Sequence, residues 1–178
     1  SSYDTVNGAT TTNMTLASGA TINVDSGEIN SMLLANVAEN RLTIGDQAIT
    51  VTGEITVDVA NDLGITAGGK VTATIATTET VAELATLSAD GGTNDLTIVI
   101  RDADATAATA EQLNAIDAAT AVAVDARAVT ELSGSYSDLV TLYGSSGVTG
   151  LENENITITG GSLTVTQATA IDLLTTGV

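Results

Sequence analysis

Short apolar segments that recur along the chain are the feature that most restricts its fold. Six of them are rich in β-branched residues and begin at intervals of between 23 and 34 residues. β-Branched side chains suit the pleated, buried surface of a sheet, so these segments are predicted strands. They are TINVD (21–25), AITVTG (48–53), VTATIA (71–76), DLTIVIRD (95–102), AVAVDA (121–126) and NITITG (155–160).

Helices are predicted between several of these strands. Val81, Leu84 and Leu87 lie three residues apart, which is the spacing of one face of a helix. Three segments also carry a Ser/Thr-x-x-Glu/Gln capping box, in which a hydroxyl and a longer side chain satisfy free backbone N–H groups at a helix start. The boxes are Thr80 with Glu83, Thr109 with Gln112, and Thr164 with Gln167.

A strand followed by a helix at a regular interval predicts parallel strand pairing with right-handed crossovers. The chain is shorter than a (β/α)₈ barrel requires, since such barrels need about 250 residues. We therefore expect an α/β fold, a right-handed α/β solenoid of about six strand-helix coils with a parallel sheet. The coils should start near residues 21, 48, 71, 95, 121 and 155 of a repeat domain over 21–178, and residues 1–20 should be an N-terminal extension or cap.

Composition restricts the core and the chemistry further. The 178 residues include no Phe or Trp, so the core must consist of small branched side chains, and runs such as LTIVI (96–100) indicate strands buried on both faces. There is also no His or Cys, which excludes a Ser-His-Asp triad, thiol catalysis and the usual zinc sites. No segment has the roughly 18 consecutive apolar residues of a membrane-spanning helix.

The charge is strongly acidic. Twenty-two Asp and Glu against 4 Lys and Arg give a net charge of -18, which would repel nucleic acid and anionic lipid. We expect no nucleic-acid partner and no membrane insertion. Cations or high salt would relieve the repulsion among the carboxylates.

Four segments carry a resemblance to a known class of repeats: VTATIATTETVAELATL (71–87), AVAVDARAVTELSG (121–134), VTGLENENITITGGSLTV (148–165) and ATAIDLLTTGV (168–178). They resemble α/β repeats of very large acidic secreted or cell-surface proteins of marine bacteria, cyanobacteria especially, in which calcium-binding RTX repeats often occur as well. The resemblance implies an extracellular or cell-surface structural array. In such arrays the LTTGV segment runs on into a strand, so the end of this chain resembles a repeat boundary.

Two loops are candidate calcium sites, because Ca²⁺ takes six to eight oxygen ligands from carboxylates, amides and carbonyls. The segment from Asp90 through Asn94 to Asp95 partly matches the RTX turn, with Asn94 where a glycine is expected. Glu152 and Glu154 form the second loop. Each segment also fits an interpretation without a metal ion: the first can be a turn between a helix and a strand, and the second a solvated loop.

An acidic carbohydrate-active enzyme is one alternative function, since paired carboxylates are the acid-base pairs that this composition offers. Asp25, Asp102 and Asp125 end their predicted strands and could lie on adjacent coils. The same positions suit turn-forming residues that cap the next helix. We favour this second interpretation and expect no enzymatic activity.

The expected function is therefore a structural repeat module of an extracellular filament, surface layer, matrix or adhesin, with Ca²⁺ as a stabilising ion. Its expected partners are further copies stacked head to tail, because an unpaired strand edge invites another chain, together with cell-surface polysaccharide. A virion fibre or decoration protein is a second alternative with the same repeat and acidity.

Overall fold

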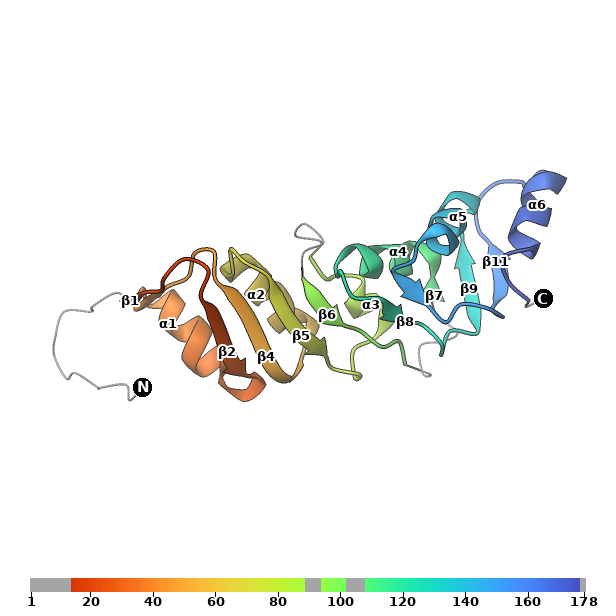
Figure 1. Ribbon diagram of the computed structural model, residues 1–178. Helices are drawn as coiled ribbons and strands as arrows, with labels where there is room; N and C mark the ends of the chain where they lie inside the picture. The colour runs from red at the N-terminus through yellow and green to blue at the C-terminus, as the bar shows by residue number, and fades with distance from the viewer. Residues whose placement is uncertain (1–13, 89–93, 102–107, 177–178) are drawn as a thin grey trace.

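The structure is a computed structural model that describes residues 14–88, 94–101 and 108–176. It is a mixed α/β fold, elongated, in which the colour gradient runs from one end of the body to the other (Figure 1). The described strands form parallel sheets and close into no barrel. They are β1 (Met14–Thr15), β2 (Thr21–Asp25), β3 (Leu42–Thr43), β4 (Ala48–Ile55), β5 (Val71–Ile75), β6 (Asp95–Thr97), β7 (Ala108–Thr109), β8 (Val124–Asp125), β9 (Glu131–Gly134), β10 (Val148–Thr149) and β11 (Asn155–Ile158).

Helical segments follow most of these strands. The first is composite, a 3₁₀ turn and a π-helical stretch that lead into a short α-helix. The segments are η1 (Ser26–Glu28), η2 (Ile29–Leu34), α1 (Ala35–Ala38), α2 (Val57–Thr66), α3 (Val81–Leu84), α4 (Ala110–Ala118), α5 (Tyr136–Gly144) and α6 (Val165–Asp172).

Every strand pair in the described residues is parallel, and its partners lie between 20 and 28 residues apart in the sequence. The longest sheet has the order β2-β4-β5-β6, and a second has the order β11-β9-β7. Towards the C-terminus the offset is constant, because both the β8–β10 and β9–β11 pairs join residues 24 apart. Strands β4, β5 and β9 are therefore each paired with an earlier strand on one side and a later strand on the other, and the remaining described strands lie at sheet edges.

The helix starts were predicted correctly at the three capping boxes. Thr80, Thr109 and Thr164 each accept a hydrogen bond from the N3 backbone N–H, and the N3 side chain accepts one from the cap residue in return. Two further helices begin in a related way, at Thr56 and Ser135, whose side chains also accept from the backbone. Caps of this kind satisfy N–H groups that a helix leaves unpaired.

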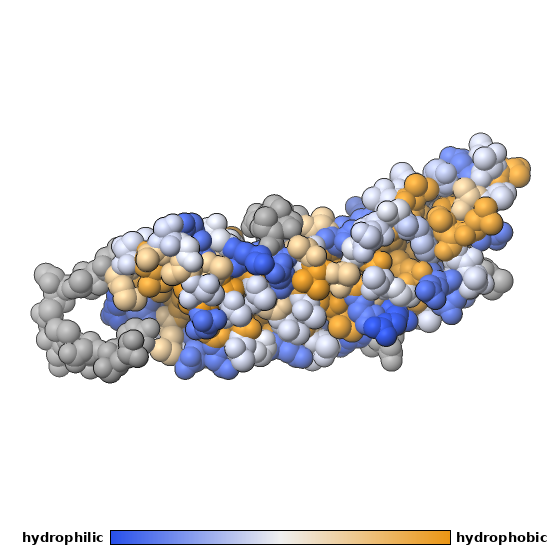
Figure 2. Space-filling model, in the orientation of Figure 1, coloured by the Kyte–Doolittle hydropathy of each residue, from blue (hydrophilic) through white to orange (hydrophobic). Residues whose placement is uncertain are grey.

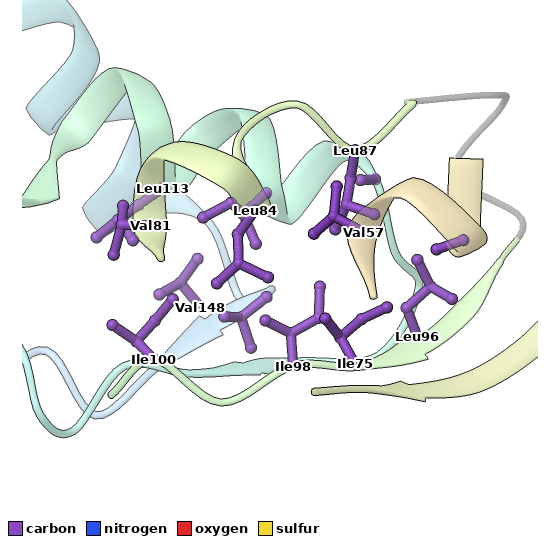
Figure 3. Close-up of a cluster of buried hydrophobic side chains, with 14 of the residues drawn as sticks. Val57, Ile75, Val81, Leu84, Leu87, Leu96, Ile98, Ile100, Leu113 and Val148 are labelled. Atoms are coloured by element: carbon purple, nitrogen blue, oxygen red, sulfur yellow. The ribbon is translucent and has the colours of Figure 1, made fainter. Parts of the chain in front are cut away.

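The core lies between the strands and the helices, as the close-up in Figure 3 shows for Ile75, Leu84, Ile98 and their neighbours. The helices cover one face of each sheet. For this reason the expectation that LTIVI is buried on both faces is wrong: Leu96, Ile98 and Ile100 are buried, whereas Thr97 and Val99 are exposed. Alternation of this kind marks a sheet with one solvated face.

Polar side chains that lie shortly before strands β4, β6, β8 and β10 bind earlier parts of the chain. We call Gln47, Asn94, Thr120 and Ser145 the polar column. Gln47 Nε2 donates to the carbonyl oxygen of Ala17 (2.9 Å), Asn94 Oδ1 accepts from the N–H of Val71 (3.0 Å), and Ser145 Oγ donates to Asp117 (2.6 Å).

Thr120 of this column binds both backbone groups of Leu96. Its hydroxyl accepts from the N–H of Leu96 (2.9 Å) and donates to the carbonyl oxygen of the same residue (2.8 Å), and all three groups are buried. Buried backbone groups are costly when unpaired. The polar column therefore satisfies backbone groups that the short strands leave without ladder partners.

Most of the predicted strands are present, but with different lengths and neighbours. The predicted strand 121–126 shortens to β8, and the predicted strand 155–160 shortens to β11, which is preceded by β10 at Val148–Thr149. Helix α2 and strand β9 were not predicted. In the segment 1–20, β1 pairs with β3, and residues 1–13 lie outside the described residues.

The substitution Thr120→Val tests the polar column. Valine has nearly the shape of threonine but leaves the Leu96 N–H without its acceptor, so we expect a loss of about 1–3 kcal/mol in the free energy of unfolding. The matched control is Thr141→Val, whose exposed hydroxyl donates only within its own helix to Ser137; its cost should stay within about 0.5 kcal/mol. Equal costs in urea denaturation of the two variants would show that the column does not stabilise the fold.

Candidate functional site

In the first predicted calcium loop, Asn94 and Asp95 both bind residues at or just before the start of β5. Asn94 is buried and its amide oxygen accepts from Val71, while Asp95 forms an ion pair with Lys70 (2.5 Å). Asp90 lies outside the described residues. The described part of this loop therefore connects β6 to the strand before it.

The second predicted loop, between β10 and β11, contains two very different glutamates. Glu152 is exposed, whereas Glu154 has no accessible surface at all. The expectation of a solvated loop is therefore wrong for Glu154. The two loops adjoin strands of different sheets, β6 and β11, and among the described residues no three Asp, Glu, His or Cys side chains gather closely enough to hold a metal ion. The calcium assignment to Asp90, Asn94, Asp95, Glu152 and Glu154 stays a prediction.

The aspartates considered for acid-base chemistry have turn-forming contacts. Asp25 caps η1 by accepting from the N–H of Gly27, and Asp125 accepts from the N–H of Arg127 and pairs with its guanidinium group (2.8 Å). The guanidinium hydrogen bond holds the pKa of Asp125 below its usual value. The two residues lie in different sheets, on β2 and β8, and Asp102 lies outside the described part of the chain.

Glu154 organises the C-terminal end of the molecule. One carboxylate oxygen accepts from the N–H groups of Glu152 (2.7 Å) and Asn153 (3.4 Å), and the other accepts from the hydroxyl of Tyr143 (2.7 Å). A buried carboxylate is tolerated only with such partners. The loop is therefore folded around its own side chain and fastened to the end of α5.

The last residues described are attached to this same loop. The hydroxyl of Thr175 donates to the carbonyl oxygen of Glu154 (2.9 Å), and the N–H and hydroxyl of Thr176 both donate to that of Glu152. The segment after α6 is thereby held against the loop before β11.

The contacts of Tyr143 affect the pKa of its phenol group. Burial of the phenol raises the pKa of Tyr143 above its ordinary value of 10.0, and the hydrogen bond to the Glu154 carboxylate raises it further. Both causes favour the neutral phenol, because a phenolate would lose solvation and face a second negative charge.

Beside this loop lies an open apolar groove between β11 and α6, with a volume of about 180 Å³. Figure 2 shows the apolar surface that gathers over this end of the molecule. Val165 and Leu173 of the same end are 84% and 80% exposed. The groove is lined by Ile156, Ile158, Leu163, Ala168, Ile171, Asp172 and Thr175.

We call the groove together with Val165, Leu173 and the edge of β11 the C-terminal face. Its side chains can bury apolar area against a partner, and its edge strand can accept a further strand. Most of the side chains that line the groove are apolar. Sequence reasoning missed the groove because the helical stripe of Val165, Ala168 and Ile171 looks the same whether or not another segment covers it.

No family model, curated protein or solved structure matches the chain. The resemblance to secreted bacterial repeats therefore stays an inference from the quoted segments. Among the described residues, none of the helices has both the length and the apolar composition needed to cross a membrane.

The substitution Tyr143→Phe tests the Glu154 contacts. It removes one of three donors to a buried carboxylate, so we expect the free energy of unfolding at neutral pH to fall by about 1–3 kcal/mol. The wild type should also lose stability as the pH rises above 10.0, because the unfolded phenol ionises there while the folded one stays neutral.

The control is Tyr136→Phe on the same helix, whose hydroxyl makes no contact with Glu154. The alkaline loss of stability due to the buried phenol should be absent from Tyr143→Phe and retained in Tyr136→Phe, as measured by urea denaturation at a series of pH values. Indistinguishable profiles for the two variants would contradict this role of Tyr143.

Proposed function

We propose that the chain is a structural module of an extracellular array, built as a right-handed α/β solenoid of about six strand-helix coils that assembles end to end. Parallel pairing at a repeated offset supports the solenoid, because such pairing lets the chain add one coil after another along an axis. The order of the segments along the elongated body agrees with this.

The C-terminal face is the observation that carries the proposal. An exposed apolar surface next to an unpaired strand edge is costly for a protein that stays alone in water, and it commonly marks an interaction site. By comparison, helices α2, α3 and α4 bury their first residue, and Tyr136, the first residue of α5, is half-buried.

The charge sets the conditions under which such an assembly would form. Two copies that each carry -18 repel one another, so contact requires that the repulsion be screened. The acidic surface would keep an assembled array hydrated and prevent lateral aggregation. An extracellular or cell-surface setting with abundant salt and calcium fits this requirement, and it is also what the sequence resemblance implies.

Sedimentation velocity of the chain tests the proposal. In dilute buffer we expect monomers, and at about 0.15 M NaCl or above we expect a concentration-dependent series of larger species, because the Debye length falls to about 8 Å. A CaCl₂ sample matched to the NaCl sample in ionic strength separates bound calcium from screening: stronger association in CaCl₂ supports calcium sites, and equal association supports screening alone. A chain that stays monomeric in every condition would contradict end-to-end assembly.

A further inference from the structure

We infer that the C-terminal face binds the N-terminal unit of a second copy of this chain, and that this contact repeats the one between neighbouring units inside the chain. The inference rests on the proposed end-to-end assembly. It adds which surface of one copy binds which surface of the next, and in which direction the copies follow one another. The partner surface is formed by β1, β2 and η2, and we call it the N-terminal face.

The helices provide the first argument, because their positions can be compared from one unit to the next. The residue directly after the cap is Val57 in α2, Val81 in α3 and Ala110 in α4, and each of these is at most 3% exposed. The equivalent residue of α6 is Val165, which is 84% exposed. In α5 the equivalent residue, Tyr136, is half-buried. The first helical position is therefore buried or half-buried in α2 to α5 and exposed in α6.

The strands provide the second argument. Ile156 of β11 is paired in register with Leu132 of β9. Leu132 has β7 on one side and β11 on the other and is 1% exposed, whereas Ile156 has a strand on one side only among the residues that the structure describes and is half-buried.

The backbone of β11 leads to the same conclusion. The N–H groups of Asn155 and Thr159 donate towards β9, to the carbonyl oxygens of Thr130 and Gly134. Successive residues of a strand direct their backbone N–H and C=O groups to opposite sides. The N–H and C=O groups of Ile156 and Ile158 therefore point away from β9, towards the open edge. The open edge is therefore ready for one more parallel strand.

The N-terminal end of the molecule has two edge strands whose spacing matches that of the edge strands of the C-terminal face. β1 and β2 are both edge strands of their sheets, and they begin seven residues apart, at Met14 and Thr21. β10 and β11 are the edge strands of the C-terminal face, and they also begin seven residues apart, at Val148 and Asn155.

A second copy can therefore pair β1 with β10 and β2 with β11 in the parallel sense used throughout the chain. Met14 and Met32 of the N-terminal face are 47% and 39% exposed. Methionine side chains are flexible and fill irregular apolar gaps such as the groove.

The polarity of this contact determines the shape of the assembly. Joining an N-terminal face to a C-terminal face is heterologous, so every copy keeps one free end and the assembly grows as an open filament. Two C-terminal faces placed together would instead set one β11 antiparallel to the other and stop at a dimer.

Single cysteines in the full chain distinguish these arrangements cleanly, since the sequence has no Cys of its own. Thr157→Cys places the thiol on β11, Asn23→Cys places it on β2, and both positions are exposed strand centres. Paired strands bring such residues within reach of a disulfide. Ile65→Cys, at a residue of α2 that is 79% exposed, is the control away from both faces.

The variants are mixed in pairs, one of them carrying a mass tag, under mild oxidation at concentrations where the wild type associates. We expect a covalent heterodimer from Thr157→Cys with Asn23→Cys, and at least about tenfold less product from Thr157→Cys alone or from either variant with Ile65→Cys.

A second measurement uses charge. Val165→Glu should raise the dissociation constant of self-association at least about tenfold, because it removes an apolar contact and adds a buried charge, while Ile65→Glu should leave it unchanged.

The inference is overturned if Thr157→Cys cross-links mainly to itself, if Ile65→Cys cross-links as well as the paired variants, or if an associating wild type gives no cross-link between the two faces. In each of these cases the chain still assembles, so the proposed function survives and only the assignment of the faces fails. A wild type that remains monomeric at every salt concentration removes the proposed function and this inference together.

Discussion

Parallel backbone pairing between each segment and the one a repeat later is the constraint on which the rest of the structure depends. Strands as short as β8 and β10 hold only two residues each, so they cannot supply stability alone. The registers Val124 to Val148 and Glu131 to Asn155 share one offset, which lets both strands and the helix after them repeat together. The small apolar side chains then fill a continuous layer between strands and helices.

Polar side chains bind backbone N–H and C=O groups that the short strands leave without a hydrogen-bond partner. Gln47, Asn94 and Thr120 pair backbone groups of the preceding repeat, and Glu154 pairs those of its own loop. Glu154 also joins the end of α5 to the segment after α6 through Tyr143 and Thr175. The loop beside the groove is therefore held in place by contacts within the chain itself.

The sequence predicted the local features well and the spatial ones poorly. Capping boxes such as Thr80 with Glu83 depend only on residues three apart, so they were predicted correctly. Helix α2 was missed although Val57, Ala60 and Leu63 lie three apart, because its N3 residue is Val59 and its start therefore lacks the Glu or Gln of a capping box. The burial of Glu154 depends on Tyr143, eleven residues earlier, and nothing in a glutamate-rich loop indicates it. The exposure of Val165 depends on which segments pack against α6, which no local pattern can show.

Removal of one whole repeat tests the account most directly. Deleting residues 124–147 places Val148 where Val124 was and, by the same offset, Asn155 where Glu131 was. A chain held together by neighbour contacts at this register should still fold, with a circular dichroism spectrum of the same shape and a cooperative thermal transition. A shorter deletion over residues 124–143, which leaves Val148 and Asn155 out of register with their new neighbours, should not fold. An in-register deletion that is unfolded would contradict the account.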